Sequence, residues 1–334
     1  MTEPAPWRRA AREGADSPYR HAAPPADEVP DYRTLTYEVD GRVARLTFDR
    51  PEQGNAITPD TPVELADAVE RADLDPRVHV IVLSGRGKGF CGGYDLTASA
   101  ENLLEGGLGR SGGTGGTVLD PAVQAANHDP AGTWDPMVDY QMMSRFTKGF
   151  ASLLHADKPT VAKVHGFCVA GGTDIALHCD QVVIAADAKI GYPPTRVWGV
   201  PSAGLWAHRL GDQRAKRLLL TGDCLSGREA AEWGLAVEAP EPDELDERTE
   251  VLVQRIAAMP LNQLMMVKLA LNSALLAQGV HQSRTISTVF DGISRHTREG
   301  YAFQQRAAEV GFRQAVRERD AAPYDDHGSS TNKG

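Results

Sequence analysis

The chain has 334 residues, of which 41% are hydrophobic and 24% are charged. At about 150 residues per domain, this length allows about two domains with a real buried core. The formal net charge of −10 argues against a general nucleic-acid binder, which needs Lys and Arg to displace counterions. No apolar run approaches the roughly 20 residues that span a bilayer. We therefore expect neither a nucleic-acid partner nor a membrane partner.

The four cysteines form no CxxC pair and lie in apolar or glycine-rich surroundings, a pattern typical of buried free thiols. Free thiols favour a reducing compartment, so the expected location is the cytoplasm. The first residues carry several arginines but no apolar core, so no secretory signal is expected, and the acidic residues among them disfavour a mitochondrial transit peptide. The cysteines are Cys91, Cys168, Cys179 and Cys224.

The first hundred residues predict a flexible start followed by β and α elements. Residues 1–31 are rich in Pro, Ala and charge without any period, which indicates a disordered arm. Alternating residues over 35–48, around Asp40-Gly41, predict a β-hairpin. Residues 61–72 place apolar side chains on one helical face. The apolar run 78–83 predicts a strand that is covered on both sides, as in an α/β sheet.

The remaining chain predicts further βα units and then helices. Residues 97–135 form a glycine-rich insertion, which is functional or disordered in compact domains. A helix is expected over 135–154, a strand, glycine turn and helix over 160–179, and a strand over 181–185. The region 203–322 is mostly helical, and the tail 323–334 is expected to be disordered. The predicted fold class is therefore α/β with a helical C-terminal region. The expected C-terminal helices span 213–220, 228–233, 245–258, 264–277 and 282–294.

Two glycine-rich turns follow apolar strands, GFCGGYDL at 89–96 and GFCVAGGTDIA at 166–176. Glycine permits sharp turns and leaves backbone N–H groups uncovered. The helix expected to begin near Gly172 adds free N–H groups and its dipole. Two such N–H groups converging from separate turns would form an oxyanion hole for a developing enolate. Either turn alone is equally compatible with a merely tight turn, and neither has the terminal Lys-Ser or Lys-Thr of a Walker phosphate loop.

Together with further short motifs, these turns resemble the crotonase (enoyl-CoA hydratase/isomerase) superfamily. The resemblance covers about residues 34–320 and leaves the first thirty residues and the glycine-rich insertion outside. The further motifs are Arg50-Pro51 with Asn55-Ala56, Lys158-Pro159-Thr160, Cys179-Asp180, and Leu220-Thr221-Gly222-Asp223 followed by Ala230, Ala231 and Gly234-Leu235.

The resemblance implies a spiral of ββα units over residues 32–202 and a helical trimerisation region over 203–322. It implies an acyl-CoA thioester as substrate, with coenzyme A as part of that substrate, no separate cofactor and no metal. It also implies a homotrimer, or a hexamer built as a dimer of trimers.

The same resemblance assigns the binding groups. The thioester oxygen would lie between the backbone N–H groups of Tyr94 and Gly171. Main-chain groups around Asp95 and Leu96 would face the adenine of coenzyme A. Both assignments use backbone atoms, so they depend on the two turns rather than on particular side chains.

Hydratases of this family use two glutamates, and their positions fall on Asp174 and Pro194. Asp174 is expected to be the catalytic acid or base, the alternative being a first-turn carboxylate favoured only by the helix dipole. Proline cannot transfer protons, so Pro194 is a departure from the two-glutamate pattern. Tyr192 is a candidate hydrogen-bond donor to substrate or a packing aromatic, while Asp180 is expected to make structural hydrogen bonds.

Three basic residues have open roles. Arg196 either pairs with a carboxylate such as Asp174 or points to solvent. Lys268 is a candidate for the coenzyme A phosphates, as is Arg319, and the alternative for both is solvated surface charge.

The expected function is hydration of a 2-enoyl-CoA thioester, or the reverse dehydration, by an enoyl-CoA hydratase-like lyase. Another reaction of the superfamily on acyl-CoA, isomerisation or hydrolysis, is an alternative, because the same oxyanion hole serves them all. A non-catalytic acyl-CoA-binding protein is the second alternative, which the proline at position 194 favours and Asp174 opposes.

Overall fold

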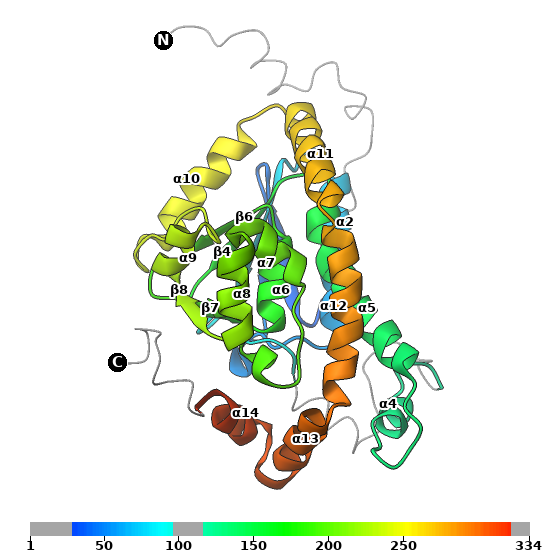
Figure 1. Cartoon of the computed structure of the whole chain (residues 1–334). Helices are drawn as coiled ribbons and strands as arrows, with labels where there is room; N and C mark the ends of the chain where they lie inside the picture. The colour runs from blue at the N-terminus through cyan, green and yellow to red at the C-terminus, as the bar shows by residue number, and fades with distance from the viewer. Residues whose placement is uncertain (1–28, 96–115, 322–334) are drawn as a thin grey trace, which may run out of the picture.

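The computed structural model describes residues 29–95 and 116–321 (Figure 1). Most of the arm expected at 1–31, Leu96 at the end of the first glycine turn, the first part of the insertion expected at 97–135, and the tail 323–334 lie outside the described residues. The described residues include both glycine turns, apart from Leu96.

The larger sheet has five strands in the order β1-β2-β3-β4-β6. The hairpin pair is antiparallel, and the other neighbours are parallel. The run Val80–Leu83 is buried on both sides of the sheet, as its continuous apolar sequence predicted. The strands are β1 (Leu35–Asp40), β2 (Val43–Phe48), β3 (Val80–Gly85), β4 (Thr160–Val164) and β6 (Gln181–Ile184).

The smaller sheet has the order β5-β7-β8, formed by β5 (Phe167–Val169), β7 (Lys189–Gly191) and β8 (Cys224–Ser226). The chain passes from β4 to β5 and then into helix α6 (Gly171–His178), and it repeats this path through β6 and β7. A bridge between Cys91 and Cys168 aligns the first glycine turn with β5. This alternation between two sheets followed by a helix confirms the predicted spiral of ββα units.

Helices α2 (Asp60–Leu74) and α5 (Pro136–His155) pack against each other beside the larger sheet. The predicted loop at 97–135 is wrong in its second part, where α4 (Pro121–Asn127) forms. Its start is specified locally, because the Asp120 carboxylate accepts a hydrogen bond from the Ala122 N–H and proline occupies the first turn. Glycine-rich composition nearby concealed that capping signal.

The region from residue 203 onward is helical apart from β8, as expected. Helix α12 runs along α5 and also packs on α7 (Figure 1). No helix of the described residues is both long enough and apolar enough to cross a membrane. The helices are α7 (Ala203–Leu210), α8 (Asp212–Thr221), α9 (Gly227–Trp233), α10 (Leu245–Ala257), α11 (Leu261–Ala277), α12 (Val280–Arg295), α13 (Arg298–Val310) and α14 (Phe312–Ala321).

The core is one large apolar cluster that joins the sheets to α2, α5, α6 and the first C-terminal helices. A smaller cluster around Phe303, Ala307 and Ala315 joins α13 to α14. All four cysteines are buried and unpaired, which confirms the prediction of free thiols.

Candidate active site

The first glycine turn holds the backbone on both sides of Tyr94. The Ile57 N–H donates to the Gly93 carbonyl at 2.8 Å, and the Asp95 N–H donates to the Ile57 carbonyl at 2.9 Å. In this parallel bridge the Tyr94 N–H points away from Ile57, and it has no hydrogen-bond partner within the described chain. The Arg50 guanidinium pairs with the Asp95 carboxylate at 2.8 Å and so fixes the end of the turn.

The second turn touches the first at the start of α6. Gly93 has a φ of +96°, and a Cβ there would lie 2.7 Å from the Cβ of Ala170 and 3.5 Å from the Gly171 nitrogen. Ala170 itself has a φ of 52° and a ψ of −132°, a strained conformation for a residue with a side chain. The Gly171 N–H has no partner in the described part of the protein. Two free N–H groups, of Tyr94 and Gly171, therefore lie on neighbouring backbone segments, as an oxyanion hole requires.

Beside these turns lies a cavity of about 10 Å³, close to the size of a single water molecule. Its walls come from α5, α6, α12, the first turn and the segment after β7. Its lining includes two carboxyl groups and two phenols, and Pro194 is not part of it. The polar lining residues are Tyr94, Thr147, Asp174, Tyr192, Ser202, Ser287, Thr288 and Asp291, with Met143 and Val200 beside them.

Asp174 faces this cavity from α6, and its Oδ1 accepts a hydrogen bond from the Ser202 N–H at 2.9 Å. Burial raises the pKa of the Asp174 carboxyl to about 7, and the nearby charge of Asp291 acts in the same direction. A carboxyl group that titrates near neutral pH is suited both to give and to take a proton. Asp174 also lies in the first turn of α6, where the helix dipole favours a carboxylate, so its catalytic role stays a prediction.

Asp291 faces the same cavity from α12, and sequence reasoning missed it. Its Oδ1 accepts a hydrogen bond from the Val200 N–H at 3.1 Å, and its Oδ2 lies 3.5 Å from Nη2 of Arg295. Burial raises the pKa of Asp291, although Arg295 and the Val200 bond oppose the shift. In the sequence, Asp291 and Arg295 are four residues apart and look like an ordinary surface pair.

Tyr94 and Tyr192 add two phenol groups to the cavity. Burial, followed by the charges of Asp174 and Asp291, holds the pKa of both phenols well above the usual value, so both are neutral donors. Tyr192 is buried, and the Tyr94 ring packs edge-on against Phe146 at 5.5 Å between centroids. Tyr192 is therefore a buried aromatic that also lines the cavity, and its role as a hydrogen-bond donor to substrate stays a prediction.

Lys268 is not where a phosphate ligand is expected. Its ammonium donates to the carbonyls of Leu153 at 3.1 Å and Lys158 at 2.9 Å, and it pairs with Asp180 at 2.9 Å. Only 5% of the residue is exposed, so the expected contact with coenzyme A phosphates and the surface alternative are both corrected. Asp180 also accepts from the Thr160 N–H at 2.8 Å, which confirms its structural role.

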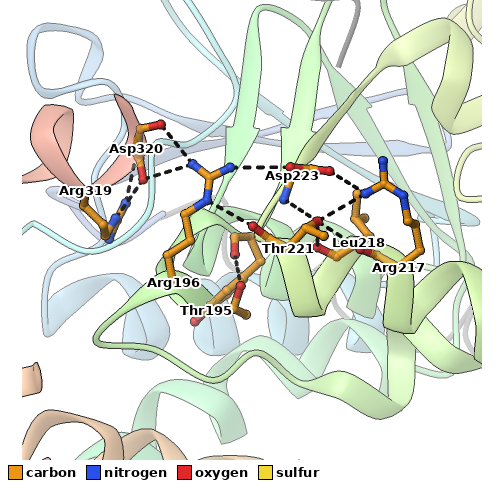
Figure 2. A network of polar contacts seen from close by, with 9 residues as sticks. Thr195, Arg196, Arg217, Leu218, Thr221, Asp223, Arg319 and Asp320 are labelled. Atoms are coloured by element: carbon orange, nitrogen blue, oxygen red, sulfur yellow. Dashed lines mark hydrogen bonds and ion pairs between the residues drawn. The ribbon is translucent and has the colours of Figure 1, made fainter. Parts of the chain in front are cut away.

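Arg196 belongs to a different network, at the join of α8, β8 and α14 (Figure 2). Its guanidinium donates to the carbonyls of Thr221 at 3.1 Å and Asp320 at 3.2 Å, and it lies 3.5 Å from the Asp223 carboxylate. Of the two alternatives for Arg196, pairing with a carboxylate is confirmed, with Asp223 and Asp320 as the described partners, and exposure to solvent is wrong, since its side chain is 11% exposed. Arg319, the other phosphate candidate, pairs with Asp320 at 2.8 Å.

The expected adenine contacts are only partly visible. The Asp95 N–H is used by Ile57, and Leu96 lies outside the described residues, so an adenine site at this position stays a prediction. Within the described ranges, no three His, Cys, Asp or Glu side chains are arranged to hold a metal ion.

Comparison with known proteins gives consistent matches. Residues 38–110 and 134–308 match the model of the enoyl-CoA hydratase/isomerase family. The fold is similar to a crystal structure of an enoyl-CoA hydratase from Mycobacterium smegmatis, with 68% identity and a TM-score of 0.81 over 89% of this chain and 96% of that one. A putative enoyl-CoA hydratase of Mycobacterium tuberculosis is 30% identical over 75% of this chain and 76% of its own length. An (E)-benzylidenesuccinyl-CoA hydratase of Thauera aromatica is 28% identical, over 82% and 97% respectively.

Proposed function

The chain belongs to the enoyl-CoA hydratase/isomerase family, and from this premise we propose that it hydrates a 2-enoyl-CoA thioester or catalyses the reverse dehydration. One observation carries the proposal: a water-sized cavity holds Asp174, with its pKa near 7, beside the free N–H groups of Tyr94 and Gly171. Water, a proton-transfer group and oxyanion donors are the three things that this reaction needs.

In the proposed reaction, the thioester oxygen accepts hydrogen bonds from the Tyr94 and Gly171 N–H groups. These donors stabilise the enolate that forms when the water oxygen bonds to C3. Removing one such donor typically costs about 3 kcal/mol of barrier in enzymes with oxyanion holes. Asp174 exchanges a proton with the reacting atoms, and the phenols of Tyr94 and Tyr192 supply hydrogen bonds without ionising. No separate cofactor is required.

We further propose a homotrimer, or a hexamer of two trimers, in the cytoplasm. Exposed apolar side chains on α11 and α12 support an assembly, because a soluble monomer rarely exposes so many large apolar groups on adjoining helices. These residues are Met266, Val267, Leu269, Leu271, Ile286, Phe290 and Ile293.

Double-bond isomerisation on an acyl-CoA is the second candidate. The proline at position 194 favours it, since moving one proton between two carbons needs only one acid–base group. A 1,2-epoxyphenylacetyl-CoA isomerase of Escherichia coli is 27% identical over 76% of this chain and 84% of its own length.

The test is turnover of crotonyl-CoA, followed by the loss of its conjugated absorbance, with chromatography of the products. Formation of 3-hydroxybutyryl-CoA supports hydration, and an unconjugated isomer supports the second candidate. Calorimetry with butyryl-CoA, butyrate and free coenzyme A tests binding separately. Binding of butyryl-CoA without any turnover would contradict both reactions and leave an acyl-CoA-binding protein.

A further inference from the structure

Two carboxyl groups from distant parts of the chain are held by one short segment. The Val200 N–H donates to Asp291, and the Ser202 N–H donates to Asp174. Pro201 lies between them and has no N–H, so the two donors are separated by a single residue that cannot compete for either carboxylate.

This arrangement limits the distance between the acids. Backbone nitrogens two residues apart are separated by at most about 7 Å. Each carboxylate lies about one hydrogen bond beyond its donor, and both line the same water-sized cavity. A single water molecule in that cavity is therefore within reach of both groups.

We propose that Asp291 is a second catalytic carboxyl group of this active site, supplied by α12 in place of the residue that Pro194 cannot provide. The inference rests on the proposed function and deepens it. It explains how a chain with proline at that position retains a two-carboxyl cavity.

The charged and titratable groups around Asp291 and Asp174 determine which of the two carboxyl groups is the base and which is the acid. Arg295, on the same helix, lies 3.5 Å from Asp291 and favours its ionised form. Asp139 on α5 shares Arg295 at 3.5 Å and is paired with His296, while the phenols of Tyr94 and Tyr192 stay neutral.

Burial and the charge of Asp291 favour the protonated form of Asp174, and the backbone and side-chain hydrogen bonds from Ser202 that oppose them come from neutral donors. The negative charge of ionised Asp291 raises the pKa of Asp174, so protonation of Asp174 and ionisation of Asp291 favour each other. Asp291 is thus the base, and Asp174 is the acid.

The step balances with one water molecule. Ionised Asp291 takes a proton from water as the water oxygen bonds to C3, and the C2–C3 double-bond electrons move toward the thioester oxygen. Asp174 then gives its proton to C2 as the enolate collapses. The substrate has gained H and OH, and the proton now on Asp291 returns to Asp174 through the next water that enters the cavity.

A purely structural role for Asp291 is the competing explanation, since it also anchors Val200 and Arg295. Asp139 provides the matched control, because it is also buried and pairs with the same Arg295 but does not line the cavity. Removing either charge disturbs the same arginine, and asparagine at position 291 keeps an acceptor for the Val200 N–H, so a difference between the pH–rate profiles of the two variants separates a catalytic role from a structural one.

The experiment is steady-state kinetics of the full chain and of the Asp291→Asn and Asp139→Asn variants on crotonyl-CoA, from pH 5 to pH 10. We expect Asp291→Asn to lower kcat roughly 100- to 10,000-fold with little change in KM, and to lose the acidic limb of the pH–rate profile. Asp139→Asn should lower the melting temperature while kcat stays within about threefold. Unchanged kcat and pH profile in a folded Asp291→Asn variant would overturn the inference and leave the proposed hydration intact.

A second measurement tests the carboxyl pair without turnover. Infrared spectroscopy with ¹³C-labelled aspartate should show one protonated buried carboxyl near neutral pH, lost in Asp174→Asn. Its titration midpoint should fall in Asp291→Asn, because a like charge has been removed. If the wild type does not act on crotonyl-CoA, the proposed function fails, and an unshifted midpoint would then overturn the carboxyl pair as well. A shifted midpoint would support the pair on its own.

Discussion

The cavity around Asp174 and the network around Arg196 shift the pKa of a carboxyl group in opposite directions. In the network, burial would raise the pKa of Asp223, but hydrogen bonds from Arg217 and Thr221 and the charges of Arg217 and Arg196 hold it below its usual range. In the cavity, burial and then the charge of Asp291 raise the pKa of Asp174 to about 7, because only neutral donors of Ser202 oppose them. The network stabilises the fold, whereas the cavity keeps an acid that can exchange its proton.

The difference shows which partly or fully buried acids of this chain are structural. Asp75, Asp180 and Asp223 each have a cationic partner and hydrogen bonds that satisfy the ionised form. Asp174 lacks the cation, and in Asp291 the partial compensation by Arg295 does not overcome burial. A carboxylate left under-compensated in a cavity costs stability, so its presence there indicates function.

The largest expected effect is on catalysis. Asp174→Asn keeps the size of the side chain and its acceptor for the Ser202 N–H but cannot transfer protons. We expect kcat on crotonyl-CoA to fall roughly 100- to 10,000-fold, equivalent to about 3–5 kcal/mol of barrier, with KM nearly unchanged. Steady-state kinetics at pH 7 measures this.

The control for that variant is Asp180→Asn, which removes the partner of the buried Lys268 ammonium and should lower the melting temperature with less specific effect on rate. Wild-type turnover by a folded Asp174→Asn variant would contradict the acid–base role of Asp174.

The next effect is on folding. Arg196→Met removes hydrogen bonds to two carbonyls and the pair with Asp223. Breaking a mostly buried pair should lower the free energy of unfolding by about 3 kcal/mol. Arg217→Met is the matched control, because Arg217 is 48% exposed and its pair with Asp223 is expected to contribute less than about 1 kcal/mol. Urea unfolding measures the free energy of unfolding of both variants. Equal losses of stability would show that the burial of Arg196 does not make its interactions more stabilising.

The two regions should also respond to pH with opposite sign. The raised pKa of Asp174 gives stability that is fully present below about pH 3.9 and is lost as pH rises through about 7, with a slope of at most about 1.4 kcal/mol per pH unit. The lowered pKa of Asp223 gives stability that is present above the unfolded value and is lost as pH falls through the folded one.

Melting curves from pH 3 to pH 8 should therefore show the stability of Asp174→Asn rising relative to the wild type between about pH 4 and pH 7. Asp223→Asn should differ most from the wild type near neutral pH, and the difference should shrink in acid. If the melting temperatures of the three proteins changed in parallel with pH, the two regions would not differ in the sign of their pH dependence.

The smallest expected effect concerns backbone strain at the edge of the cavity. Ala170 has a positive φ that glycine adopts freely. Relief of about 1–3 kcal/mol of strain, less the entropy cost of glycine, should make Ala170→Gly more stable by about 1 kcal/mol. Chemical denaturation measures the gain, and a loss of stability would show that contacts of the Ala170 methyl group outweigh the strain.

Much of this architecture could be predicted because its signals are local. Alternation specified the hairpin, the apolar run specified β3, and the two glycine turns with Asp174 lie within short motifs. The proposed oxyanion donors are backbone groups of these turns, so the resemblance carried by the turns was enough to assign them.

The rest depends on where distant segments meet. Asp291 has the sequence context of a solvated helix residue, and only the packing of α12 on α5 and α7 brings it to the cavity. Lys268 and Arg196 look like surface cations, because nothing local reveals the carbonyl oxygens that receive them. The helix α4 was missed because its capping aspartate lies in glycine-rich sequence.

Helix α12 has two faces with different exposure. Ser287, Thr288 and Asp291 are buried toward the cavity, while Ile286, Phe290 and Ile293 are exposed on the other side. If the proposed trimer forms through the exposed face, subunit association and the placement of Asp291 are thermodynamically linked, because a partner that binds this face favours the docked helix. Specific activity per protomer would then fall on dilution below the dissociation constant of the assembly, which makes the enzyme's own concentration a regulator of its rate.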